Sequence, residues 1–150
     1  MGRKHQMPRI LGLNLVALIV ATLAFYAVGA VWYGALFAEL WTGLWGFTDA
    51  QMTAAEASAG PAMAMGFAIT LVTTAFLGLA LKALKAGGLA GAVKWAVFLW
   101  AGFVVTTMAY DIAYAMQPMM LLVLDGAHTL IGFVIAAAIL TAMDGVAVKD

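Results

Sequence analysis

The sequence ILGLNLVALIVATLAFYAVGAVWYGALF, residues 10–37, decides the fold because it contains no charged side chain. A helix that crosses a membrane needs about 20 mostly apolar residues, and this stretch exceeds that length. It also lacks the alternation of polar and apolar residues that a transmembrane β-strand requires. We therefore predict that residues 10–37 form a membrane-spanning helix.

Three more apolar stretches follow along the chain. We predict further spans at about residues 61–81, 94–112 and 119–143. Pro8, Pro61 and Pro118 stand just before or at the start of a span, where a helix tolerates the missing N–H of proline. The expected fold is an all-α integral membrane protein, with residues 1–150 forming a single domain that is an antiparallel bundle of four transmembrane helices.

The composition agrees with this fold and excludes several functions. Hydrophobic residues make up 66% of the chain and charged residues 9%, whereas about 25% of an average soluble domain is charged. The lipid bilayer is therefore the expected partner. A net charge of zero argues against binding of nucleic acid, and the lack of cysteine excludes disulfides and thiolate metal sites. Nothing in the sequence indicates a resident cofactor.

The basic residues predict the orientation in the membrane, because they gather on the cytoplasmic side of spans. In a model with four crossings, all seven fall on one side: Arg3, Lys4, Arg9, Lys82, Lys85, Lys94 and Lys149. The connection of residues 38–60 and the turn after the third span carry acidic residues but no base. We therefore expect both termini to be cytoplasmic and these two connections to face outward.

The connection after the first span has aromatic residues at nearly helical spacing. These apolar residues are Phe37, Leu40, Trp41, Leu44, Trp45 and Phe47. Tryptophan favours the headgroup level of a membrane, so we expect the first span to continue into the outer interface or to turn onto it. Thr48 with Gln51, and Thr53 with Glu56, each fit a capping box at the start of a surface helix.

The residues GAVWYGALFAELW, 29–41, are similar to the start of a bacterial family of small four-helix membrane proteins, domain of unknown function 1761. That family typically has a glycine, then Trp-Tyr, then a later tryptophan where the first helix leaves the membrane. Gly102, Phe103, Thr106 and Thr107 in the third span, and Asp125 with His128 in the fourth, also resemble it. Here Gly34-Ala35 replaces the Ser-Pro that often follows Trp-Tyr. The resemblance implies a multi-pass protein of the bacterial inner membrane, but no activity.

Asp125 and His128 are the main candidates for a functional site, because ionisable groups in a membrane span are costly. They are three residues apart and share one helix face, near the outer boundary and level with Asp111. One interpretation is a hydrogen-bonded pair that ties helices together, with Tyr110, Tyr114 or Tyr33 as partner. The alternatives are a proton or cation site, or a metal site that Asp111 or Glu39 would complete.

Other polar and small residues in the spans have structural interpretations. Asn14 is expected to form a hydrogen bond between helices, and threonines such as Thr70, Thr106 and Thr107 to bond the carbonyl four residues earlier. Small residues also recur four apart, and such pairs let helices approach closely. These pairs are Ala17 and Ala21, Ala30 and Gly34, Ala62 and Gly66, and Gly132 and Ala136.

Together these features predict a non-enzymatic membrane protein that binds a partner or a small ligand. The binding surface would be an outer rim of aromatic and acidic residues: Trp32, Tyr33, Glu39, Trp41, Asp111, Asp125 and His128. One alternative is a proton- or cation-coupled carrier that uses the Asp125–His128 pair. Four helices enclose little space, so that carrier would act as a homo-oligomer. The other alternative is a membrane enzyme with the same pair as acid and base.

Overall fold

The computed structural model describes residues 8–147, which are mainly helical. In chain order the elements are β1 (Arg9–Ile10), β2 (Leu13–Asn14), α1 (Leu15–Val31), the π-helix η1 (Trp32–Leu36), α2 (Ala38–Trp45), α3 (Asp49–Ala57), α4 (Ala59–Ala83), α5 (Gly88–Leu99), the π-helix η2 (Trp100–Val105), α6 (Thr106–Tyr114) and α7 (Met119–Asp144). Within the described part, four continuous helices are long and apolar enough to cross a membrane: Leu15–Leu36, Ala59–Ala83, Gly88–Tyr114 and Met119–Asp144. Arg3, Lys4 and Lys149, which entered the orientation argument, lie outside the described residues.

The first helix begins at Leu15, not at Ile10 as predicted. β1 and β2 form an antiparallel hairpin whose turn residues, Leu11 and Gly12, have φ angles of 51° and 80°. Such angles lie outside the α-helical region and do not occur in the interior of a helix. Asn14 then caps α1, because its side-chain oxygen accepts hydrogen bonds from the N–H groups of the second and third helical residues. The prediction that Asn14 bonds another helix through its side chain is therefore wrong.

The third long helix begins at Gly88, well before the predicted start at Lys94. Gly87 and Gly88 have φ angles of 69° and 76°, so they form the turn that the sequence predicted. Lys94 lies on an exposed face of α5, where its long side chain can reach the polar side of a membrane. The charged residue Lys94 therefore does not mark the start of this helix, as the sequence analysis had assumed.

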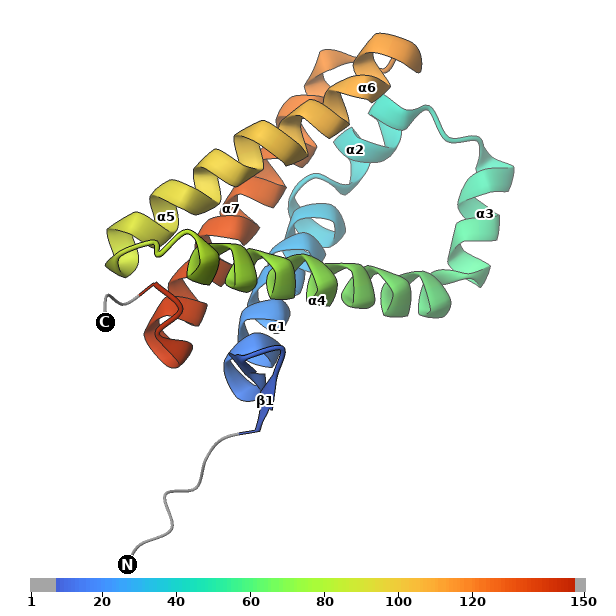
Figure 1. Ribbon diagram of the computed structural model, residues 1–150. Coiled ribbons are helices and arrows are strands. Elements are labelled where there is room, and N and C mark those ends of the chain that lie inside the picture. The colour runs from blue at the N-terminus through green and yellow to red at the C-terminus, as the bar shows by residue number, and fades with distance from the viewer. Residues whose placement is uncertain (1–7, 148–150) are drawn as a thin grey trace, which may run out of the picture.

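Three of the long helices lie side by side, and α4 crosses them (Figure 1). α7 packs between α1 on one side and the α5–η2–α6 helix on the other. The buried residues of α4 are all in its C-terminal half, at Thr74, Leu77, Gly78 and Leu81. Its first turns are exposed and diverge from α1, so α4 departs from the regular bundle that the sequence predicted.

One buried carboxylate joins the hairpin, α4 and α7 at the end where the basic residues lie. Asp144 has a side chain that is 1% exposed, and its oxygens lie 2.8 Å from the Arg9 guanidinium and 3.4 Å from the Lys82 ammonium. It also accepts a hydrogen bond of 2.9 Å from the backbone N–H of Asn14. We call these four residues the Asp144 cluster.

The chain turns sharply at Phe37, between η1 and α2, as expected for a helix that turns onto an interface. Thr48 and Gln51 form the predicted capping box at the start of α3, a helix that is exposed along its length (Figure 1). The second predicted box is wrong. Thr53 lies in the middle of α3 and its hydroxyl donates to the Asp49 carbonyl.

Candidate functional site

A tyrosine on η1 connects the two polar residues of α7. The Tyr33 hydroxyl donates a hydrogen bond of 2.6 Å to Asp125 Oδ1 and lies 3.4 Å from His128 Nδ1. Asp125 and His128 are one helical turn apart, so both face α1 and η1. Tyr33 lies in η1, and a π-helix has about one more residue per turn than an α-helix. The side chains of η1 are therefore rotated about the helix axis relative to those of α1, and Tyr33 faces Asp125 and His128.

The hydrogen bond between Tyr33 and Asp125 favours one neutral tautomer of His128. A tyrosine hydroxyl has one hydrogen, and the short bond assigns that hydrogen to Asp125. The contact with His128 is then a hydrogen bond only if Nδ1–H donates to the hydroxyl oxygen. This tautomer leaves Nε2 as an acceptor, and Nε2 has no hydrogen-bond partner among residues 8–147.

Aromatic rings surround the imidazole of His128. Its ring centre lies 6.0 Å from that of Phe25, 6.4 Å from that of Trp32 and 5.0 Å from that of Tyr33. Its Nε2 atom faces Gly29, because a methyl group there would lie 3.0 Å from Nε2. Glycine therefore leaves space in front of the free acceptor.

That space belongs to an open groove of about 660 Å³ between α1, η1, α2, α4 and α7. The groove has a mainly apolar lining: Phe25, Tyr26, Gly29, Ala30, Tyr33, Gly34, Trp41, Ala62, Met63, Gly66, Thr70 and His128. Small-molecule sites usually have about 300–1,000 Å³ and a few placed polar groups in an apolar wall. The groove has this form, with His128 as its placed acceptor.

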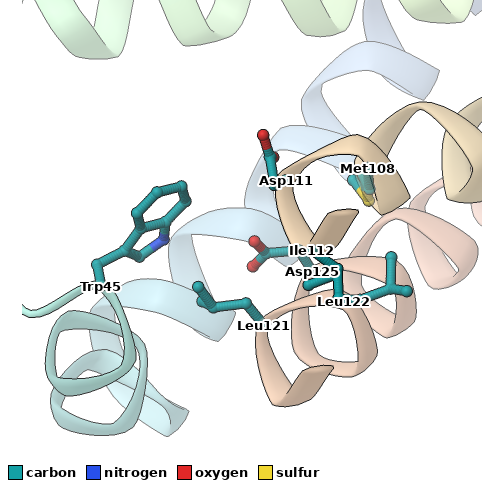
Figure 2. A pocket seen from close by; sticks show the side chains of 7 residues that line it. All are labelled: Trp45, Met108, Asp111, Ile112, Leu121, Leu122 and Asp125. Atoms are coloured by element: carbon teal, nitrogen blue, oxygen red, sulfur yellow. The ribbon is translucent and has the colours of Figure 1, made fainter. Parts of the chain in front are cut away.

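A second, much smaller cavity lies on the other side of Tyr33, next to Asp125. Figure 2 shows its lining residues, which include Asp111 from α6, Asp125 from α7 and Trp45 from α2. Its volume of about 20 Å³ is enough for one water molecule. The Asp125 carboxylate points toward Trp45, whose buried indole N–H has no partner among the described residues. We call this space the acidic pocket.

The structure divides the predicted rim into separate parts. Tyr33, Trp41 and His128 line the groove, Trp32 packs beside the imidazole, and Asp111 and Asp125 line the acidic pocket. Two candidates lie apart from both spaces. Tyr110 is 63% exposed and stacks on Tyr114, and Glu39 is exposed in the first turn of α2.

A metal site finds no support in this arrangement. Within residues 8–147, no group of three or more histidine and acidic side chains is close enough to hold a metal ion. Zinc needs three or four such ligands, and His128 with Asp125 supplies two.

Sequence reasoning missed Gly29 and Trp45 as parts of the two spaces. Gly29 lies four residues before Tyr33, and on a helix that spacing places both on one face. It therefore could have been found once Tyr33 was chosen. Nothing in the sequence brings Trp45 to Asp125, because the turn at Phe37 sets the direction of α2.

Four helices that are long and apolar enough to cross a membrane are typical of a small multi-pass α-helical membrane protein. The chain belongs to the family described as Protein of unknown function (DUF1761), whose model matches residues 16–141. The match covers all four long helices except the last few residues of α7 and the first residue of α1. No curated protein and no solved structure matches the chain.

Proposed function

We propose that this protein lies in the bacterial inner membrane and binds a small apolar ligand in its groove, without catalysing a reaction. The ligand carries a hydroxyl or N–H group that donates a hydrogen bond to His128 Nε2. The observation that carries the proposal is the free acceptor that Tyr33 and Asp125 hold in place at the wall of an apolar groove. Nε2 has no partner within the described residues, so a matching donor on the ligand adds affinity.

The proposed orientation puts the basic residues on the cytoplasmic side and the groove near the outer side. The Asp144 cluster, with Arg9 and Lys82, marks the cytoplasmic end of the helices. Tyr33, Asp125 and His128 lie toward the opposite end of α1 and α7. Both termini are cytoplasmic in this arrangement, and the exposed helix α3 faces outward.

The groove favours a ligand with a large apolar part. Four aromatic side chains, those of Phe25, Tyr26, Tyr33 and Trp41, contribute to its wall. No residue of α4 from Ala59 to Leu81 is ionisable, so α4 offers no charged partner to the ligand. Lipid-soluble alcohols and phenols combine an apolar body with one donor, and they are the class that we propose.

The test measures retention of 2-naphthol by the full-length protein in lipid nanodiscs, compared with empty nanodiscs. A matched compound, 2-methoxynaphthalene, has the same rings but no donor. We expect selective retention of 2-naphthol, by about fivefold, because the hydrogen bond contributes roughly 1 kcal/mol. Equal retention of the two compounds would show that the groove selects apolar bulk alone, and the proposal would be wrong.

Two glycines of the groove provide a matched pair of variants. Gly29→Ala places a methyl group 3.0 Å from His128 Nε2, so it blocks the acceptor. Gly34→Ala adds a methyl group to the same groove with no atom within 4 Å. We expect Gly29→Ala to abolish the preference for 2-naphthol and Gly34→Ala to retain it. The reverse order would contradict the role of Nε2.

A further inference from the structure

The groove and the acidic pocket share one wall, and Tyr33 crosses it. Tyr33 lines the groove, while its hydroxyl contacts Asp125, which lines the acidic pocket. His128 lies on the groove side of the same hydroxyl, 3.4 Å away. A continuous series of donors and acceptors therefore runs from Nε2 in the groove to the carboxylate in the acidic pocket.

We propose that His128, Tyr33 and Asp125 form a proton relay, and that the ligand of the groove is a weak acid that gives its O–H proton to this relay. The inference rests on the proposed function, because the proton donor must first bind at Nε2. It narrows the ligand class to lipid-soluble phenols and similar hydroxyl compounds.

Each step of the relay replaces one bond to hydrogen by another. The ligand O–H bond breaks and an N–H bond forms at His128 Nε2, while the electron pair stays on the ligand oxygen as an anion. The Nδ1 proton then passes to the Tyr33 oxygen, and the Tyr33 proton passes to Asp125 Oδ1. The imidazole ends as its other neutral tautomer, Asp125 ends neutral, and the total charge is unchanged.

The distances fit this order of events. The Tyr33–Asp125 bond of 2.6 Å is short, as expected for a hydroxyl that donates to a carboxylate. The 3.4 Å contact between Tyr33 and His128 is long, and such contacts in a ligand-free site shorten when the ligand binds. Proton transfer through the relay therefore depends on occupancy of the groove.

The acidic pocket provides a route by which the proton can leave Asp125. It has room for one water molecule between Asp125, Asp111 and the buried indole N–H of Trp45. Asp111 on α6 is the other ionisable side chain among the residues that line this pocket. Glu39 on α2 is exposed, and α4 supplies no ionisable group to the groove side. The proton thus leaves toward Asp111, on the side away from the ligand.

The test uses 2-naphthol as a photoacid in nanodiscs that contain the full-length protein. Light makes its hydroxyl strongly acidic, and loss of the proton is seen as naphtholate emission. We expect naphtholate emission from the wild-type complex beyond that of empty nanodiscs. Tyr33→Phe keeps the aromatic ring but removes the hydroxyl, so we expect that variant to lose most of the naphtholate emission per retained molecule of 2-naphthol.

Asp125→Asn is a second variant, so the relay can still be tested if Tyr33→Phe does not fold. Its amide oxygen still accepts the Tyr33 hydrogen bond but does not take up the proton, so the naphtholate emission per retained molecule of 2-naphthol is again expected to fall. Wild-type emission in either variant, or no naphtholate emission from occupied wild type, would overturn the relay and leave ligand binding intact. Failure of the wild type to retain 2-naphthol would instead overturn the proposed function, and the relay with it.

Discussion

Gly132→Ala tests whether the close contact of α1 and α7 holds the fold together. A methyl group at Gly132 would lie 1.9 Å from Phe25 Cε2 and 2.1 Å from Phe25 Cδ2. Carbon atoms in good contact are about 3.5–4.0 Å apart, so the phenyl ring would have to move by about 1.5–2 Å. Phe25 is 5% exposed and packs against the rings of Phe133 and His128, which leave it little room.

The size of the effect follows from two opposing terms. Overpacking of a buried site costs about 1–3 kcal/mol, and alanine gains about 1 kcal/mol over glycine inside a helix. Gly126→Ala, also in α7, has the same gain, but its methyl group would lie 3.7 Å from Trp100 Cζ2, an ordinary contact. The difference between the two variants therefore isolates the clash, and we expect Gly132→Ala to be less stable by about 2 kcal/mol.

The assay is unfolding in mixed micelles with increasing SDS, followed by circular dichroism. Phe25→Leu adds a second control, because the smaller side chain makes room for the methyl group. In the double variant, Gly132→Ala should therefore cost less than it does alone, with a coupling energy of about 1–2 kcal/mol. Equal stability of Gly132→Ala and Gly126→Ala would refute the contact on which this reasoning depends.

Two further predictions concern the Asp144 cluster and the orientation. Asp144→Ala leaves the N–H of Asn14 without its acceptor, so we expect it to reduce the free energy of unfolding by about 2–4 kcal/mol. Asp144→Asn retains an acceptor for this N–H, so we expect a reduction of about 1 kcal/mol in the same assay. Equal losses would show that the ion pairs dominate. Because the chain has no cysteine, single variants Ala54→Cys and Lys85→Cys report the orientation by labelling with an impermeant maleimide. We expect labelling of intact cells at residue 54 and, only after permeabilisation, at residue 85; labelling of both from one side would contradict the proposed topology.

The four long helices were predictable because uninterrupted apolar length is a strong signal. Their ends were less so, since Lys94 lies inside α5 and the residues before Asn14 form a hairpin. The threonine prediction was confirmed, as the hydroxyls of Thr70, Thr106 and Thr107 donate to carbonyls four residues earlier. These are local interactions, and local sequence encodes them.

The partner of the Asp125–His128 pair was not decided by the sequence. Tyr33, Tyr110 and Tyr114 were equal candidates, because a choice among them needs the rotation of each helix about its axis. The π-helix η1 sets that rotation for Tyr33, and no residue pattern announces it. The sequence likewise did not decide which small-residue pairs pack between helices. Those with Ala21 and Ala136 lie in the buried core, whereas those with Gly34 and Gly66 line the groove.

The Asp144 cluster holds the C-terminal end of α4 in place, so the N-terminal half of this helix can rotate about a fixed point. Its C-terminal half is fastened by buried contacts near Gly78 and by Lys82, while its exposed first turns are joined to α1 by the Tyr26 hydroxyl, which donates a hydrogen bond of 3.0 Å to the Met63 carbonyl. Met63 is about 22 Å from Gly78 along the helix, so a rotation of about 10° at Gly78 would displace Met63 by about 4 Å. The mouth of the groove can therefore widen while the pivot stays packed, once the hydrogen bond between Tyr26 and Met63 breaks. A single binding protein built this way can accept ligands with apolar tails of different bulk.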